Sequence, residues 1–142
     1  MVGGIVGIVL AAVTGILFMP IQTTVRPSEA DARSALAKLT HQPEDGKLLS
    51  EVSQILRRYV AAAFELPSGE MTTVEFSAAI AGNEKIGAEL AQTISSFLRE
   101  CDERKFSPVN SSAPLNAATR ALELISLAEK VRDRRDACPT TK

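Results

Sequence analysis

The sequence is poor in the residues on which metal sites and thiol chemistry depend. Its 142 residues include one histidine, two cysteines and no tryptophan. His41 has no cysteine or second histidine near it, so metal-ligand spacing is absent, and no motif makes it a base for a nucleophile. Cys101 and Cys138 are isolated and should be free thiols in a reducing compartment. We therefore expect no enzyme, no metal and no cofactor.

The sequence also lacks an excess of charge of either sign. The sequence has sixteen basic and seventeen acidic side chains. Nucleic-acid-binding proteins usually carry a strong basic excess, so we expect no nucleic-acid partner. The glycines do not form a phosphate-binding loop. Alanine and leucine supply most of the apolar content, and no segment alternates apolar and polar residues as a strand would. The pattern predicts an all-α protein.

Charge is missing altogether from residues 1–25, where the run "MVGGIVGIVLAAVTGILFM" is nearly all apolar. About 20 apolar residues are enough to cross a bilayer, so this run predicts a transmembrane anchor helix that ends near Pro20. A buried core helix would need the rest of a small domain to surround it. A signal peptide would need a basic start and a nearby cleavage site, and neither is present. Arg26, Arg33 and Lys38 follow the run, so the positive-inside rule places the N-terminus outside and residues 26–142 in the cytoplasm. The expected location is the inner membrane, with a single pass.

Small residues recur every four positions in this anchor, at Gly3, Gly7, Ala11 and Gly15. One helical stripe of small side chains lets a second helix approach closely in lipid. Glycine is also common in membrane helices generally. We favour a packing face for helix–helix association.

The rest of the chain divides into a juxtamembrane helix and loop over 26–46, a helical domain over 47–131 and a flexible tail over 132–142. We expect the anchor helix to be followed by a small bundle of four or five helices. Ser28 is the expected cap of the juxtamembrane helix. The helix from Lys47 should carry an apolar stripe at Leu48, Val52, Ile55, Tyr59 and Ala63, widened by Leu56, Val60 and Phe64.

Capping signals predict where the later helices begin. Thr72 and Glu75 have capping-box spacing, which starts a short helix over 73–81. Asn83 is the expected cap of the next helix. Ser111 or Ser112 should cap the last helix, with Pro114 in its first turn. The expected apolar side of that last helix is Leu115, Ala118, Leu122, Ile125 and Leu127.

The most highly charged stretch is "FLRECDERKF", residues 97–106. We expect Phe97, Leu98 and Cys101 to face the core, in line with Ile86, Leu90 and Ile94. Glu100 and Arg104 form an i,i+4 pair on the outer face. Phe106 should fold back onto the core at the helix end.

Three segments, "EVSQILRRYVAAAFELP", "TTVEF" and "FLRECDERKFSP", occur in this order. Together they resemble the cytoplasmic domain of bacterial single-pass proteins of unknown function. Those proteins are found alongside MoxR-type AAA+ ATPases and von Willebrand factor A proteins in Bat-like, aerotolerance-type gene clusters. The resemblance covers roughly residues 35–130 and the preceding membrane helix. The matched signature positions are Arg57, Arg58, Tyr59, Thr72, Thr73, Glu75, Phe76, Asp102, Lys105 and Phe106.

The resemblance implies an accessory role in a membrane complex and no reaction. Larger relatives carry extracytoplasmic β domains before the anchor, and this sequence shows none, so envelope-side binding is not expected. The candidate interface is Arg57 and Arg58, which would reach an acidic patch on an ATPase or von Willebrand factor A partner. The alternative for these arginines is an internal ion pair with Asp102 or Glu75. The alternative function is a small-molecule sensor or enzyme with a pocket between helices.

Overall fold

The computed structural model describes residues 29–67, 70–106 and 113–137. Within these residues the chain forms five helices and no strand: α2 (Glu29–Leu39), α3 (Gly46–Ala63), α4 (Thr73–Ala81), α5 (Ala88–Lys105) and α6 (Ala117–Ala137). The prediction of an all-α bundle is confirmed for this part of the chain. None of these five helices is long and apolar enough to cross a membrane. The predicted anchor over 1–25, its stripe of small residues, and the predicted caps Ser28, Ser111 and Ser112 lie outside the described residues.

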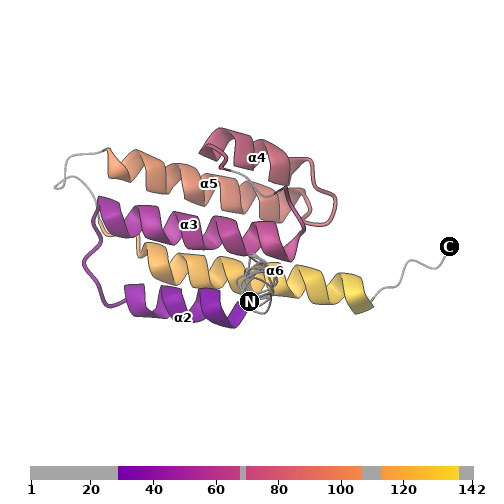
Figure 1. Ribbon diagram of the computed structural model, residues 1–142, viewed down its shortest axis with the longest axis horizontal. Helices are drawn as coiled ribbons and strands as arrows, with labels where there is room; N and C mark the ends of the chain where they lie inside the picture. The colour runs from indigo at the N-terminus through magenta and orange to yellow at the C-terminus, as the bar shows by residue number, and fades with distance from the viewer. Residues whose placement is uncertain (1–28, 68–69, 107–112, 138–142) are drawn as a thin grey trace, which may run out of the picture.

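α3 and α6 run in one direction and α2 and α5 in the opposite direction (Figure 1). α3 is central and packs against α2, α5 and α6, whereas α4 packs against α5 on the far side from α2. α2 lies beside α6, although the two are separated by most of the chain. α6 extends past the start of α2 at the end of the bundle where α3 also ends (Figure 1).

α3 begins at Gly46, where the Asp45 carboxylate accepts a hydrogen bond of 2.8 Å from the Leu48 amide. The predicted stripe is largely confirmed. Its buried members are Leu48, Val52 and Tyr59, together with Leu56, Val60 and Phe64, which widen it. Ile55 and Ala63 are only partly buried, so the buried arc is centred away from Ile55.

α4 begins as predicted, with a capping box. Thr72 Oγ1 accepts from the Glu75 amide at 3.2 Å, and Glu75 Oε2 accepts from the Thr72 amide at 2.8 Å. Each side chain therefore satisfies an amide that has no partner within the helix. Phe76 and Ile80 are the buried residues of this helix.

The start of α5 differs from the prediction. Asn83 accepts a hydrogen bond from the Lys85 amide inside a turn, and α5 starts only at Ala88, after Gly87. Gly87 has a φ of 84°, a conformation that glycine adopts without steric cost. Ile86 is buried ahead of the helix instead of on it. The turn therefore inserts Ile86 into the core before the chain becomes helical.

The inward face of α5 is confirmed, with Ile94, Phe97, Leu98 and Cys101 buried. The expectation for Phe106 is wrong, because this side chain is 86% exposed. At 100° per residue, position 106 lies on the opposite side of the helix from position 97. Phe106 therefore points away from the core that Phe97 enters.

α6 starts at Ala117, so Pro114 and Leu115 precede it and do not form its first turn. Its start is capped from a distant loop. The Glu44 carboxylate accepts from the Leu115 amide at 2.6 Å and from the Ala117 amide at 3.0 Å.

The buried side of α6 relies on small residues, since Ala117, Ala121 and Ala128 are buried. Leu127 was expected on this side but is 43% exposed. α6 continues to Ala137, so helix covers residues 132–137 of the segment expected to be a flexible tail. Basic residues in its last turn favour this extension by interacting with the helix dipole.

Candidate functional site

Arg57 connects α3 to the beginning of α4. Its Nη1 donates to the Met71 carbonyl oxygen at 3.1 Å, and its Nη2 donates to Thr73 Oγ1. Its Cζ atom lies over the Phe76 ring, 5.9 Å from the ring centroid. The guanidinium thus contacts the residue before the capping box, the first residue of α4 and the buried ring of α4.

The same network continues to α5 through Thr73. The Thr73 hydroxyl donates to Asp102 Oδ2, and Lys105 Nζ donates to Asp102 Oδ1 at 3.1 Å. Burial alone would raise the pKa of Asp102. The hydrogen bonds from Thr73 and Lys105, with the positive charges of Lys105 and Arg57, nevertheless hold this pKa below its ordinary value. Asp102 is therefore ionised at neutral pH and anchors the network on α5.

The structure thus brings together five signature positions that are far apart in the sequence. We call this set the α4 clamp: Arg57, Thr73, Phe76, Asp102 and Lys105. It joins α3, α4 and α5. Arg57 is held inside the fold by hydrogen bonds, but it forms no direct ion pair with Asp102 or Glu75 among the described residues and reaches Asp102 only through Thr73. Glu75 instead belongs to the capping box, where hydrogen bonds from Thr72 lower the pKa of its exposed carboxyl.

The other signature positions lie outside the clamp. Arg58 is exposed on α3, and no hydrogen bond or ion pair joins it to the described residues. Tyr59 is buried on the other side of α3, where its hydroxyl donates to Glu129 of α6. Burial, and then the hydrogen bond to Glu129, raise the pKa of Tyr59. Tyr59 therefore holds α3 to α6 as a neutral phenol.

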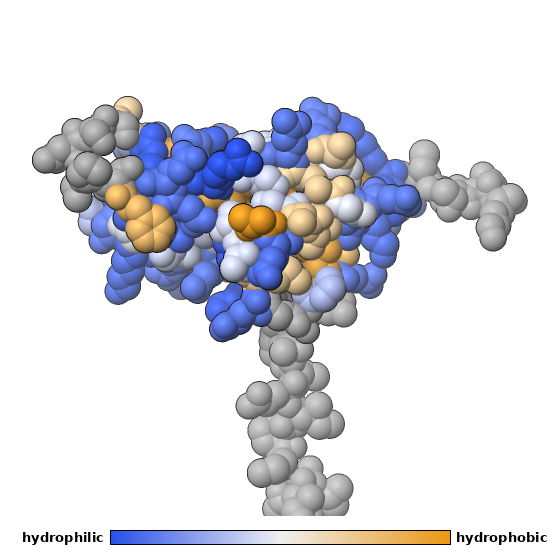
Figure 2. All heavy atoms as spheres, turned by 90° about the horizontal axis from the view of Figure 1, so that it is seen from above, coloured by the Kyte–Doolittle hydropathy of each residue, from blue (hydrophilic) through white to orange (hydrophobic). Residues whose placement is uncertain are grey.

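α4 presents an apolar face to solvent. Val74, Ala78 and Ala81 are all exposed, and their spacing places them on one side of the helix. Val74 is 79% exposed, which is unusual for a β-branched apolar side chain. Figure 2 looks onto the face that α4 covers and shows apolar side chains gathered among hydrophilic ones. We call Val74, Ala78 and Ala81 the α4 face. The spacing of these three apolar residues is visible in the sequence. The sequence alone could not show which side of α4 the other helices would cover.

The charged stretch at the end of α5 is more than a solvated face. Glu100 and Arg104 form the expected pair at 4.0 Å, but Glu100 also accepts from Arg120 of α6 at 2.8 Å. Arg120 in turn lies over the Phe97 ring, with Cζ 5.4 Å from the centroid. The α5–α6 part of this contact was not predicted, because it depends on a helix that follows in the sequence.

Cys101 is a free thiol enclosed in the core. Burial raises its pKa to about 11, despite a hydrogen bond with Ser53. The thiol is therefore protonated at neutral pH and unsuited to nucleophilic attack. Cys138 lies outside the described residues.

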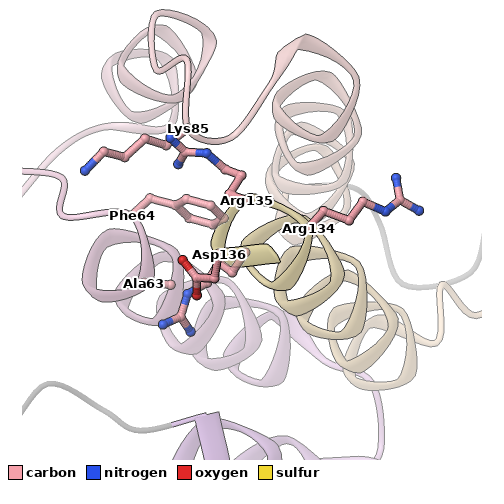
Figure 3. Close-up of a pocket in the computed structure, with 7 residues that line it drawn as sticks. Ala63, Phe64, Lys85, Arg134, Arg135 and Asp136 are labelled. Carbon is pink, nitrogen blue, oxygen red and sulfur yellow. The ribbon is translucent and has the colours of Figure 1, made fainter. Parts of the chain in front are cut away.

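A hollow of about 540 Å³ lies at the end of the bundle where α3 and α6 end. Ala63 and Phe64 form its apolar part, and the remaining lining residues are Lys85, Arg132, Arg134, Arg135 and Asp136. Figure 3 shows Arg135 and Asp136 near Phe64, and Arg134 pointing away from them. We call it the basic hollow. It lies at an open end of the bundle and is lined mainly by cations.

The described part of the chain contains no group of three or more histidine, cysteine, aspartate or glutamate side chains that could hold a metal ion. Comparison of the chain with models of known protein families, with curated proteins and with solved structures finds no match.

Proposed function

We propose that the chain is a membrane-anchored accessory protein whose helical domain docks a protein partner through the α4 face. The observation that carries this proposal is the exposed apolar side of α4 on a helix that the α4 clamp joins to α3 and α5. Exposed apolar residues that form a contiguous face are typical of interaction sites, whereas scattered ones are not. A clamped helix also loses little conformational entropy on binding, which favours affinity.

The membrane part of the proposal rests on the uncharged run over residues 1–25 and the basic residues that follow it. In this arrangement the anchor lies in the inner membrane with its N-terminus outside, and the helical domain is cytoplasmic. Gly3, Gly7, Ala11 and Gly15 offer a face for association with another membrane helix.

The partner class comes from the resemblance in the signature segments, which points to a MoxR-type AAA+ ATPase or a von Willebrand factor A protein. Arg58 is the exposed arginine of the candidate interface, next to the residue whose guanidinium contacts the start of α4. Arginine suits contact with carboxylates on a partner because its planar group offers several donors. Arg57 serves the fold, so Arg58 remains as the recognition residue of this pair.

The test is co-purification of the full-length chain with these ATPase and von Willebrand factor A proteins from bacterial membranes. We expect Val74→Asp to abolish capture, because it places a charge in the apolar face. The fold should persist, because position 74 lies in the first turn of α4, where an acidic residue is favoured by the helix dipole. Arg58→Glu should weaken capture as well.

Phe106→Ser is the matched control, since it also removes an exposed apolar side chain but from the end of α5. It should leave capture unchanged. Full capture by the Val74→Asp variant at unchanged thermal stability would rule out the α4 face as the docking site.

A further inference from the structure

The basic hollow lies at the end of the bundle where the chain enters α2. Arg33, one turn into α2, pairs with Glu29 at 2.6 Å and donates to Ser126 of α6 at 3.2 Å. Because α2 and α6 are antiparallel (Figure 1), the start of α2 lies toward the C-terminal end of α6. From Ser126 to Arg134 the helix rises about 12 Å, and from Arg33 back to Glu29 it rises about 6 Å. The tip of α6 therefore projects about 6 Å beyond the start of α2.

The distance between this end and the predicted anchor is short. Glu29 is four positions after residue 25, and an extended chain spans at most about 3.5 Å per residue. If the anchor helix ends between Pro20 and position 25, Glu29 lies within about 14 to 32 Å of its end. The projecting tip of α6 is then among the parts of the bundle nearest to the lipid headgroups.

Two of the cations in the lining are already paired. Lys85 forms an ion pair with Glu65 at 2.9 Å, and Arg132 forms one with Glu129, also at 2.9 Å. These pairs place two cationic groups at the rim without leaving them fully available.

The other two cations are available. Arg134 and Arg135 form no ion pair with the described residues, and both are exposed. The acidic groups on the same turns are Asp133 and Asp136, of which Asp136 belongs to the lining. Figure 3 shows Arg134 pointing away from Arg135, so the two arginines can contact two different anions, and only Arg135 shares its side of the helix with the Asp136 carboxylate.

We propose that the basic hollow and the tip of α6 beside it bind phosphate groups of anionic phospholipids at the membrane surface, with Arg135 contacting one headgroup from the hollow and Arg134, which points away from Arg135, contacting a second one (Figure 3). This inference rests on the anchor of the proposed function. A guanidinium can donate two parallel hydrogen bonds to phosphate oxygens, which lysine cannot do. Basic residues beside an anchor are attracted by the negative surface potential of anionic lipids, within about 10 Å at ordinary ionic strength.

The chain has no tryptophan, so Ala137→Trp supplies a single fluorescent donor at the tip of α6. The full chain carrying this substitution is reconstituted in vesicles that contain a trace of dansyl-labelled phosphatidylethanolamine as acceptor. One set of vesicles is phosphatidylcholine alone, and the other is phosphatidylcholine mixed with phosphatidylglycerol. We expect energy transfer to be stronger with phosphatidylglycerol and to weaken at high salt.

Adding Arg134→Gln and Arg135→Gln to the probe chain should remove the dependence on phosphatidylglycerol. The equilibrium between the bound and unbound tip should shift by about fivefold for each basic residue removed. Lys47→Gln with Arg99→Gln is the matched control, since both are exposed basic residues outside the hollow and the pair removes the same two charges. This pair should leave the energy transfer unchanged.

Energy transfer that is the same in both vesicle types would overturn the inference. A saturable change of tryptophan fluorescence on adding inorganic phosphate, without any response to phosphatidylglycerol, would also overturn it and indicate a free-phosphate site. Sedimentation with the vesicles tests the anchor separately. If the chain sediments with both vesicle types but its energy transfer does not depend on phosphatidylglycerol, the proposed anchor is supported and the proposed lipid site is refuted. If the chain sediments only with vesicles that contain phosphatidylglycerol, the proposed lipid site is supported and the proposed anchor is refuted.

Discussion

Replacing Arg57 with alanine should loosen α4 from the rest of the bundle. The substitution removes the hydrogen bonds to the Met71 carbonyl and to Thr73, and it removes the cation from the Phe76 ring. Hydrogen bonds from a charged donor contribute about 1.5–3 kcal/mol each, and a partly exposed cation–π contact contributes about 0.5–1 kcal/mol. Arg57 is partly exposed and its Nε has no hydrogen-bond partner, so we take the lower part of that range. We expect a loss of about 3.5–4 kcal/mol in the free energy of unfolding.

Two measurements on the full chain in mild detergent check this expectation. Thermal unfolding followed by circular dichroism reports the global loss. Hydrogen exchange reports where it occurs, and the amides of α4 should lose protection before those of α3 and α6. α4 is the sensitive element because it is short and packs mainly against α5.

Arg58→Ala is the control, because it removes the same side chain from an exposed neighbouring position. It should change the free energy of unfolding by no more than about 0.5 kcal/mol. If Arg57→Ala and Arg58→Ala have equal stability, the α4 clamp contributes nothing and the reasoning is wrong. A large loss with unchanged exchange in α4 would show that Arg57 acts elsewhere.

Three further predictions concern the cap of α6, the pH dependence of the clamp and the topology of the chain. Glu44→Gln should cost about 1 kcal/mol, because the amide side chain loses the negative charge at the start of α6 and keeps only one acceptor oxygen. Urea unfolding measures this loss, with Glu51→Gln on the exposed side of α3 as the control. The pKa of Asp102 is lower in the folded chain, so ionised Asp102 stabilises the fold above the pKa of an unfolded aspartate, and this stabilisation is lost as the pH falls through the folded value. Asp102→Asn should therefore lower the free energy of unfolding at neutral pH and make that free energy fall less steeply in acid. A reporter fused after Lys142 should fluoresce as green fluorescent protein and be inactive as alkaline phosphatase, whereas an active phosphatase would contradict the proposed topology.

Features that depend only on residues close together in the sequence could be predicted from it. The capping box of Thr72 and Glu75 involves only one helical turn, so its residues identify it directly. The inward face of α5 follows from the spacing of Phe97 and Cys101, because a regular helix repeats every 3.6 residues. The same geometry places Phe106 on the opposite side, and the error there came from assuming that an aromatic residue must be buried.

Helix boundaries were harder to predict from the sequence, because contacts with distant residues can override the local capping signals. Asn83 is a residue type that commonly caps helices. Here it lies in a turn that places Ile86 in the core, and α5 begins only at Ala88. The start of α6 depends on Glu44, which is 71 residues away from the Leu115 amide. A local pattern contains no information about such a partner.

The sequence alone therefore determined the helical class, the capping box and the inward side of α5, because each follows from spacing within a few turns. Tertiary structure decided which polar residues meet. Arg57, Thr73 and Asp102 lie on three different helices, and only the packing of α3, α4 and α5 makes them one network. The same packing leaves Val74 on the solvent side of α4 and separates Arg57 from Arg58 into an internal and an exposed residue. Adjacent residues on a helix point about 100° apart, so the neighbouring helices determine which of the two is covered.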